Sequence, residues 1–317
     1  MLGYRCRVLK FRFGPAGKPI SLKSADILKA PEFLRELGLD AMEYEAVRGV
    51  NVSEEKARAF GEEASRNNIV LSLHAPYFIN LSSKNRQTVE ASIERLKQSV
   101  LASHWMGAYV VVFHPGYYKD MPSREEAVAA VVGNLRVVAE FRDSIGARNV
   151  WLGPETTGKT SQVGDLDETI EISSKVEGTR PVVDWAHLHA RYEGKFIVSE
   201  EDVRAVVEKI EKNLGSWAIK PLHMHFSKIE YGKGGEREHH TLGEAEYGPD
   251  FKLVCSVLAE LGIEGVFISE SPILEQDALV MREICSKMCG ETCAGEVEEE
   301  AKKEGGRTRR KTRRARG

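Results

Sequence analysis

Residues 108–114 read AYVVVFH, an unbroken apolar run that ends in a histidine. A parallel strand covered by helices on both faces has this composition, because neither of its faces meets water. Residues 69–74, IVLSLH, repeat the pattern, and the stretch between the two runs has the length and polarity of a surface helix. An apolar strand, an amphipathic helix and a second apolar strand together predict a βαβ unit in a parallel sheet.

The same alternation extends along most of the chain. It predicts eight strands, at Tyr4–Lys10, Ala41–Glu45, Ile69–His74, Ala108–His114, Asn149–Glu155, Arg180–Asp184, Pro221–Phe226 and Gly265–Glu270. It predicts eight helices, at Ala25–Leu37, Ser53–Asn67, Asn85–Met106, Ser123–Phe141, Asp165–Val176, Ser199–Asn213, Pro249–Leu261 and Glu275–Met288. Eight such units within about 290 residues predict a (β/α)8 TIM barrel. A doubly wound open sheet is the alternative, but no glycine-rich phosphate-binding fingerprint follows any of these strands.

The composition, 317 residues of which 42% are hydrophobic, is that of a globular protein and excludes disorder throughout the chain. The apolar runs are too short to span a membrane. The N-terminus, MLGYRCRVLK, carries charges where a secretory signal would be apolar, and the five cysteines are an odd number. We therefore expect a cytoplasmic monomer with reduced thiols and no membrane contact. Cys285, Cys289 and Cys293, with Cys255 as a further partner, form either a metal or redox site or a set of buried thiols.

Charge is distributed unevenly between a body and a tail. Residues 302–317, KKEGGRTRRKTRRARG, contain nine Lys/Arg and one Glu for a net charge of +8. The other 301 residues, with 36 Lys/Arg and 47 Asp/Glu, carry −11. We predict a catalytic barrel domain over residues 1–290 and a charged, disordered tail over residues 291–317, because the tail has almost no apolar residue with which to pack. The tail is either a non-specific nucleic-acid arm or a solubilising or targeting segment.

Six consecutive predicted strands lead into side chains of the kinds that bind metals. These side chains are His74, His114, Glu155, Asp184 with His187, His225 preceded by His223, and Glu270. In a barrel the carboxyl ends of the strands meet at one mouth, where active sites lie. A single such residue is more often hydrogen-bonded in a core, but six in succession are costly to bury without a metal. Imidazole and carboxylate suit Zn, Mn or Fe, and their number predicts two or three ions, of zinc or alternatively manganese.

A long polar segment, residues 227–248, follows the seventh predicted strand and contains His239 and His240. We predict a loop that serves as a lid or contacts the substrate. Adjacent histidines point in different directions, so we expect one of them, His239, to join the cluster.

Six phrases of the sequence resemble endonuclease IV, a family of xylose isomerase-like TIM barrels that incise abasic DNA with three zinc ions. They are HAPYFINL at 74–81, FHPG at 113–116, ETTG at 155–158, DWAH at 184–187, HFS at 225–227 and HHTLGE at 239–244. The resemblance covers about residues 40–285 and marks the chain as a divergent member.

The resemblance implies a ligand for each ion. It assigns His74 and His114 to a first ion, Asp184, His225 and Glu270 to a second, Glu155 to a bridge between these two, and His187 and His239 to a third. Glu155 would also be catalytic, because it would orient the attacking hydroxide. The family supplies an Asp to the third ion, whereas this chain has Arg237 at that position. Glu236 or Glu238 supplies the oxygen instead, or the third site is weak or empty.

The resemblance also implies contacts with the substrate. Tyr77 matches a tyrosine with which the family contacts DNA, and Asn80 lies in the same phrase. Arg48 follows the second strand, where the family inserts a loop into the minor groove, and Arg237 is a further candidate for a phosphate contact. The family usually has a His near the end of its first strand, but this chain reads Phe11-Arg12-Phe13-Gly14 there.

The ligand cluster and the resemblance together predict a metal-dependent phosphodiesterase that acts on double-stranded DNA at abasic sites. The resemblance implies a 3′-hydroxyl and a 5′-deoxyribose phosphate as its products. The alternative is a single-metal sugar isomerase or epimerase on the same barrel. That class needs four ligands, which Glu155, Asp184, His225 and Glu270 supply. It does not need His74, His114 or His187. A DNA-binding module driven by the tail leaves the whole ligand cluster unexplained.

Overall fold

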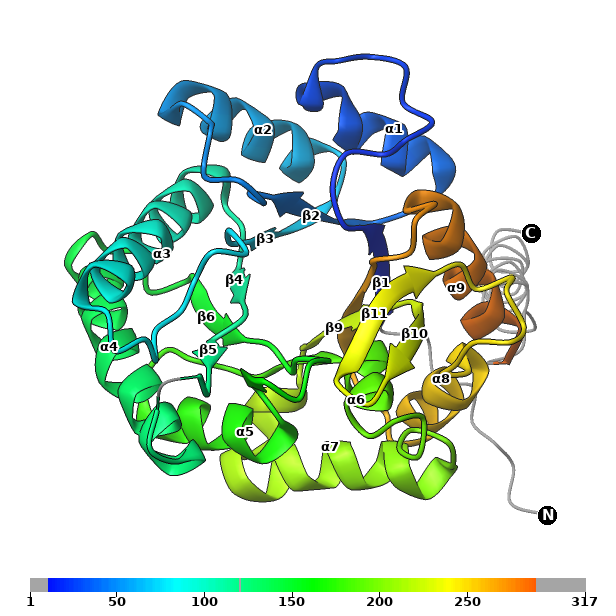
Figure 1. Ribbon diagram of the computed structural model, residues 1–317. Helices are drawn as coiled ribbons and strands as arrows, with labels where there is room; N and C mark the ends of the chain where they lie inside the picture. Colours follow the sequence, from blue (N-terminus) through cyan, green and yellow to red (C-terminus); the bar gives the residue numbers. More distant parts are fainter. Residues whose placement is uncertain (1–10, 120, 289–317) are drawn as a thin grey trace, which may run out of the picture.

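The computed structural model describes residues 11–119 and 121–288. Within them, eight parallel strands form a barrel that helices surround (Figure 1). The strands are β1 (Phe11–Pro15), β2 (Ala41–Glu45), β3 (Val70–His74), β4 (Val110–Phe113), β6 (Trp151–Pro154), β8 (Val182–Asp184), β9 (Leu222–Phe226) and β12 (Gly265–Ser269). They form two sheets, β1-β12-β9-β8 and β2-β3-β4-β6, which single bridges join at Ala16–Glu43 and Glu155–Val182. The predicted (β/α)8 barrel is confirmed.

The helices lie on the outside of the strands. They are α1 (Ala30–Leu37), α2 (Glu54–Arg66), α3 (Arg86–Met106), α4 (Arg124–Ser144), α5 (Leu166–Lys175), α6 (Trp185–Arg191), α7 (Glu200–Leu214), α8 (Phe251–Glu260) and α9 (Glu275–Met288), with short 3-10 turns at Ile27–Lys29 and Ser216–Ile219. The hydroxyls of Ser53, Ser123 and Ser199 accept backbone N–H bonds at the starts of α2, α4 and α7. Helix α6, which was not predicted, follows β8 directly because Asp184 caps it.

The first strand lies later in the chain than predicted. The barrel strand is Phe11–Pro15, and the predicted range of residues 4–10 lies outside the described residues. Phe11 and Phe13 alternate with Arg12 and pack against Phe267. Gly14 lies so close to the neighbouring strand that an added Cβ would be 1.8 Å from the carbonyl oxygen of Ala41. The alternation and the glycine are therefore what place β1 here.

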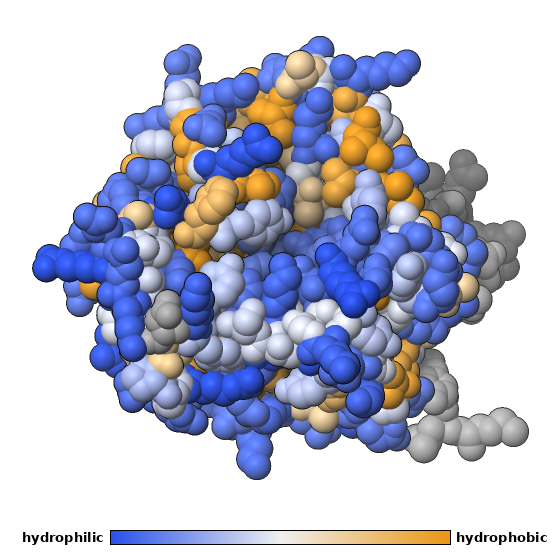
Figure 2. All heavy atoms as spheres, viewed as in Figure 1, coloured by the Kyte–Doolittle hydropathy of each residue, from blue (hydrophilic) through white to orange (hydrophobic). Residues whose placement is uncertain are grey.

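The prediction of a loop at residues 227–248 is wrong, because most of this segment is a β-hairpin. Strands β10 (Lys228–Gly232) and β11 (Gly235–His240) pair antiparallel, and Figure 1 shows this hairpin beside the barrel opening. Pairing runs from Glu230–Glu238 to Tyr231–Glu236, so Arg237 is an extra, bulged residue. A second short antiparallel pair is formed by β5 (Gly116–Tyr117) and β7 (Gln162–Val163), and a bridge between Lys159 and Gly235 joins the segment before β7 to the hairpin. Figure 2, in the same view, shows a hollow at the centre of this face.

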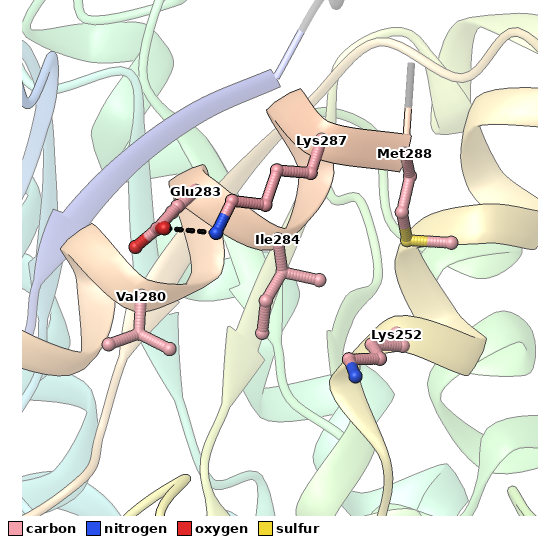
Figure 3. A pocket seen from close by; sticks show the side chains of 6 residues that line it. All are labelled: Lys252, Val280, Glu283, Ile284, Lys287 and Met288. Carbon is pink, nitrogen blue, oxygen red and sulfur yellow. Dashed lines mark hydrogen bonds and ion pairs between the residues drawn. The ribbon is translucent and has the colours of Figure 1, made fainter. Parts of the chain in front are cut away.

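Two cysteines differ from the expected reduced state. Cys255 of α8 and Cys285 of α9 form a disulfide, while Cys289 and Cys293 lie outside the described residues. Figure 3 shows a surface pocket on these two helices, where Glu283 and Lys287 form an ion pair. The residues that line it include none of the predicted site.

Among the described residues, no helix has both the length and the apolar character needed to cross a membrane. The predicted tail, residues 291–317, lies outside the described part of the chain.

Candidate functional site

Glu155, directly after β6, is the centre of the predicted cluster and is fully buried. Its Oε2 lies 3.3 Å from Nε2 of His74 and 3.1 Å from Nε2 of His114. Its Oε1 lies 3.1 Å from Nδ1 of His225 and 3.3 Å from Nδ1 of His187. Each of its two oxygens therefore faces a different pair of histidines, and one carboxylate touches side chains that come from four regions of the barrel mouth.

The ligand atoms around Glu155 fall into three groups, and within each group they lie within 4.8 Å of one another. The groups are His74, His114 and Glu155; Glu155, Asp184, His225 and Glu270; and His187, Glu236 and His239. The structure therefore brings together every residue for which the sequence predicted metal binding. Glu155 belongs to two of the groups, as the prediction that it bridges the first and second ions requires.

Three of the histidines are held by one ring nitrogen and present the other to the cluster. Nδ1 of His74 lies 2.8 Å from the carbonyl oxygen of Ala75, and Nδ1 of His187 lies 3.0 Å from that of Thr156. A carbonyl oxygen only accepts, so in the neutral rings Nδ1 carries the hydrogen and Nε2 keeps its lone pair. Nδ1 of His239 lies 2.7 Å from the hydroxyl of Ser227, which orients the ring but can either donate or accept. Such outer partners are typical of metal-binding histidines.

The bulge in the hairpin decides which carboxylate joins the third group. Glu236 Oε2 lies 3.5 Å from Nε2 of His187. Glu238 pairs opposite Glu230 and lies with His240 on the other face of the hairpin. Arg237 is exposed and donates to Glu230 at 2.9 Å. Of the alternatives for the missing aspartate, the structure therefore favours Glu236.

The charges of the cluster shift the pKa values of its members. Burial alone would raise the pKa of Glu155, but the charge of His225 and of other histidines lowers it well below its usual range. Burial alone would lower the pKa of His74, but the hydrogen bond that its ring donates to Glu155 and the charges of neighbouring carboxylates raise it to about 10. Burial raises the pKa of Asp184 to about 8, whereas the charge of His225 overcomes the effect of burial and lowers the pKa of Glu270 to about 2. Without a cation, the cluster therefore retains protons to balance its buried negative charge.

The donor set fits transition metals. Among the described residues, Oδ2 of Asp184 and Oε2 of Glu236 are buried without a hydrogen-bond partner, and both belong to the ligand groups. An unsatisfied buried carboxylate oxygen is costly, and a bound cation would satisfy it. Imidazole nitrogen and carboxylate oxygen are the ligands of zinc and manganese, whereas soft metals prefer thiolates, and these three groups consist of His, Asp and Glu alone.

The predicted substrate-binding residues lie in different settings. The ring of Tyr77 is 45% exposed and its centroid lies 5.2 Å from that of His74, so it borders the cluster. The side-chain oxygen of Asn80 accepts from the backbone and hydroxyl of Ser82 and so shapes its own loop. Arg48 is on the loop after β2, and Arg237 is turned towards Glu230.

Sequence reasoning missed two carboxylates on β2. Glu43 is fully buried, and burial raises the pKa of Glu45 to about 8 despite the nearby charge of His74. Both lie on the same side of the strand because they are two residues apart. Charged residues at alternate positions of a short buried strand, AMEYE, were the signal that could have revealed them.

Comparison with known proteins places this chain in a family. Residues 31–285 match the sequence profile of the xylose isomerase-like TIM barrels. An uncharacterized protein of Methanocaldococcus jannaschii is 38% identical over 89% of this chain and 99% of its own length. The probable endonuclease 4 of Aquifex aeolicus is 26% identical over 71% of this chain and 80% of its own length.

Two solved structures share the fold. A D-tagatose 3-epimerase-like protein aligns with a TM-score of 0.65 at 22% identity, over 90% of this chain and 99% of that one. Endonuclease IV from Thermus thermophilus aligns with a TM-score of 0.63 at 20% identity, over 86% of this chain and 97% of that one. The match to the profile over most of the chain is decisive: this protein belongs to the family of xylose isomerase-like TIM barrels.

Proposed function

We propose that this protein is a metal-dependent phosphodiesterase that incises double-stranded DNA at abasic sites. The observation that carries the proposal is the presence of three groups of ligand atoms around Glu155. A single metal ion uses about four ligands, so three groups favour two or three ions. The relatives named probable endonuclease 4 support the same reading.

The ligands that remain after one metal ion has its four ligands distinguish between the candidate reactions. Glu155, Asp184, His225 and Glu270 would suffice for one ion. His74 and His114 are additional, and so is the group of His187, Glu236 and His239. Buried histidines that serve no purpose would be costly to retain at a barrel mouth, so a reaction that needs several cations explains them better.

The residues that would hold the ions are those of the three groups. When bound, such ions supply Lewis acidity towards a phosphodiester and balance the charge that develops during its hydrolysis. Glu155 would fix the spacing of the first two positions, because each of its oxygens faces a different pair of histidines. The carbonyl oxygens of Ala75 and Thr156 would keep His74 and His187 in the metal-binding tautomer, and the hydroxyl of Ser227 would orient His239.

Recognition of the abasic nucleotide would depend on the rim of the mouth. An abasic nucleotide leaves the helical stack at little cost, because it has no base pair to lose. The exposed ring of Tyr77 offers a surface against which the extruded sugar or a flanking base can pack. Lys159, which is half exposed and lies 4.0 Å from Glu236, and Lys233 at the hairpin turn would supply positive charge for the backbone phosphates.

A sugar epimerase or isomerase is the second candidate. The group of Glu155, Asp184, His225 and Glu270 favours it, because this group is complete without the other histidines. The shared fold with the D-tagatose 3-epimerase-like protein is compatible with it, although one fold serves many reactions.

Assaying one preparation for both reactions separates the candidates. The metal-free protein is reconstituted with zinc or with manganese and given either an abasic duplex or a ketohexose. We expect incision and two to three bound ions per chain. Sugar epimerisation with one ion per chain, and no incision with either metal, would overturn the proposal in favour of the second candidate.

A further inference from the structure

A buried polar chain lies behind the candidate metal ligands, inside the barrel. Glu43 of β2 and His223 of β9 are both fully buried, and Glu43 Oε2 lies 3.1 Å from Nε2 of His223. The hydroxyl of Tyr109 lies 2.6 Å from Nδ1 of the same histidine. The other oxygen of Glu43, Oε1, lies 3.0 Å from Nε2 of His225. Branched apolar side chains usually fill this part of a barrel, so these polar groups need an explanation.

The chemistry of the four groups fixes where their hydrogens lie. Ionised Glu43 only accepts, so the nitrogens of His223 and His225 that face it both carry hydrogen. Nδ1 of neutral His223 then holds a lone pair, which accepts the hydroxyl hydrogen of Tyr109. In this arrangement the hydrogens at Nε2 of His223, at Nε2 of His225 and on the hydroxyl of Tyr109 are each on an atom within 3.1 Å of an accepting atom.

The consequence for His225 is that its lone pair is at Nδ1. That atom lies 3.1 Å from Glu155 Oε1 and 3.1 Å from Glu270 Oε1, within the second ligand group. Among the described residues, Glu43 Oε1 and His225 Nε2 are both buried and neither forms a well-aligned hydrogen bond, so each is balanced by the 3.0 Å ion-pair contact with the other. Without Glu43, the hydrogen of His225 could move to Nδ1 and block the nitrogen that a metal would need.

We propose that Glu43 is a positioning residue that fixes the tautomer and orientation of His225 for metal binding, with His223 and Tyr109 holding Glu43 in place. The inference rests on His225 being a ligand, as the proposed function requires. Glu43, His223 and His225 also lie close enough to hold an ion themselves. A neutral imidazole has one lone pair, however, and an ion at Nε2 of His225 would take the lone pair away from the mouth.

Glu43→Gln tests the proposal with almost no change in volume. The amide has one accepting oxygen and an NH2 group, so it can satisfy only one of the two histidines as the carboxylate does. We expect zinc affinity at one site to fall by about 10- to 100-fold, as for other outer partners of metal-binding histidines. Cobalt substituted at that site should show a changed visible spectrum, because one imidazole ligand is displaced.

Glu168→Gln is the matched control. Glu168 is also a buried glutamate of the barrel, but it caps α5 and accepts from the hydroxyl of Tyr118. Its variant should keep the parent's zinc affinity, measured by competition with a coloured chelator, and the parent's cobalt spectrum. Glu43→Asp keeps the charge but shortens the side chain, so its affinity should lie between those of the parent and Glu43→Gln. If Glu43→Gln does not fold, the Asp variant carries the test.

The outcomes separate this inference from the proposed function. Normal zinc affinity and an unchanged cobalt spectrum in Glu43→Gln, with His225→Ala having lost one ion, would overturn the positioning role alone. A parent that binds no more zinc than His225→Ala would overturn both, because His225 would then not be a ligand. A third outcome would show that Glu43 is itself a ligand. In that case the parent and Glu43→Asp would both bind one more zinc ion than the three mouth groups account for, and Glu43→Gln would have lost that ion.

Discussion

Replacement of Glu236 by alanine, compared with the same change at Glu238, tests how the hairpin completes the third ligand group. The two glutamates flank Arg237 in sequence, but only Glu236 lies beside His187, at 3.5 Å, and it is largely buried. Glu238 is exposed on the opposite face. The two variants therefore remove the same atoms from the same strand and differ mainly in the side of the hairpin that they affect.

The expected size of the effect follows from the number of ligands. The free energy with which a protein site of four ligands binds zinc is about 10–16 kcal/mol, or roughly 3 kcal/mol per ligand. Loss of the carboxylate from the group of His187, Glu236 and His239 should therefore lower the affinity of that group for its ion by about 100-fold, since each 1.4 kcal/mol is a factor of ten. Glu236→Ala should lose close to one zinc per chain on dialysis, and incision should fall at least about 100-fold.

The assay measures metal content and incision rate for the parent and the two variants under identical dialysis. Glu238→Ala should match the parent in both. Loss of the ion from Glu238→Ala and not from Glu236→Ala would refute the assignment that follows from the bulge. If neither variant loses metal or activity, the hairpin does not take part in the site.

Three further predictions concern the bridge, the balance of charge and the tail. Glu155→Gln should reduce incision by at least about 100-fold and change the affinity for DNA little, because phosphate contacts come from elsewhere; an incision assay with a separate binding titration checks this. In EDTA-treated protein, the free energy of unfolding should fall between pH 6.5 and 8. The pKa of His74 is raised to about 10, so its contribution is complete below about 6.5 and is lost as the pH rises; the pKa of Asp184, raised to about 8, acts with the same sign. Zinc should stabilise the protein more as the pH rises through this window, because it binds neutral imidazoles. Melting curves in which the stability of the metal-free protein does not fall, or the stabilisation by zinc does not rise, would contradict the account. Deletion of residues 302–317 should lower the slope of log affinity against log salt by up to about 7, since up to eight net charges no longer displace counterions; an unchanged slope would show that the tail does not contact DNA.

The fold was predictable because the barrel strands are short apolar runs with distinctive ends. β2 begins and ends at the predicted residues, and the ligands at the ends of β3 and β8 follow from composition alone. The hairpin at residues 228–240 was missed because only its first strand, KIEYG, alternates polar with apolar residues, whereas its second strand, GEREHH, has no apolar side chain. β1 was misplaced because residues 4–10, YRCRVLK, also alternate apolar with charged residues, as Phe11 and Phe13 do around Arg12.

The finer details of the site depend on geometry that the sequence does not encode locally. The choice between Glu236 and Glu238 depends on a one-residue bulge, which moves Arg237 to the outer face. The link between Glu43 and His225 joins strands that are far apart in the chain, so only the closed barrel brings them together. The disulfide of Cys255 with Cys285 likewise depends on the packing of α8 against α9.

The most direct test of the proposed reaction is the cleavage pattern of a labelled duplex that contains one abasic residue. With zinc-loaded parent protein, we expect a single break immediately 5′ of the abasic residue, with a 3′-hydroxyl that a DNA polymerase can extend. Glu155→Gln and the metal-free protein should leave the strand intact, as should an undamaged duplex of the same sequence. An abasic strand that stays intact with zinc and with manganese, or a break that does not depend on the abasic residue, would contradict the account.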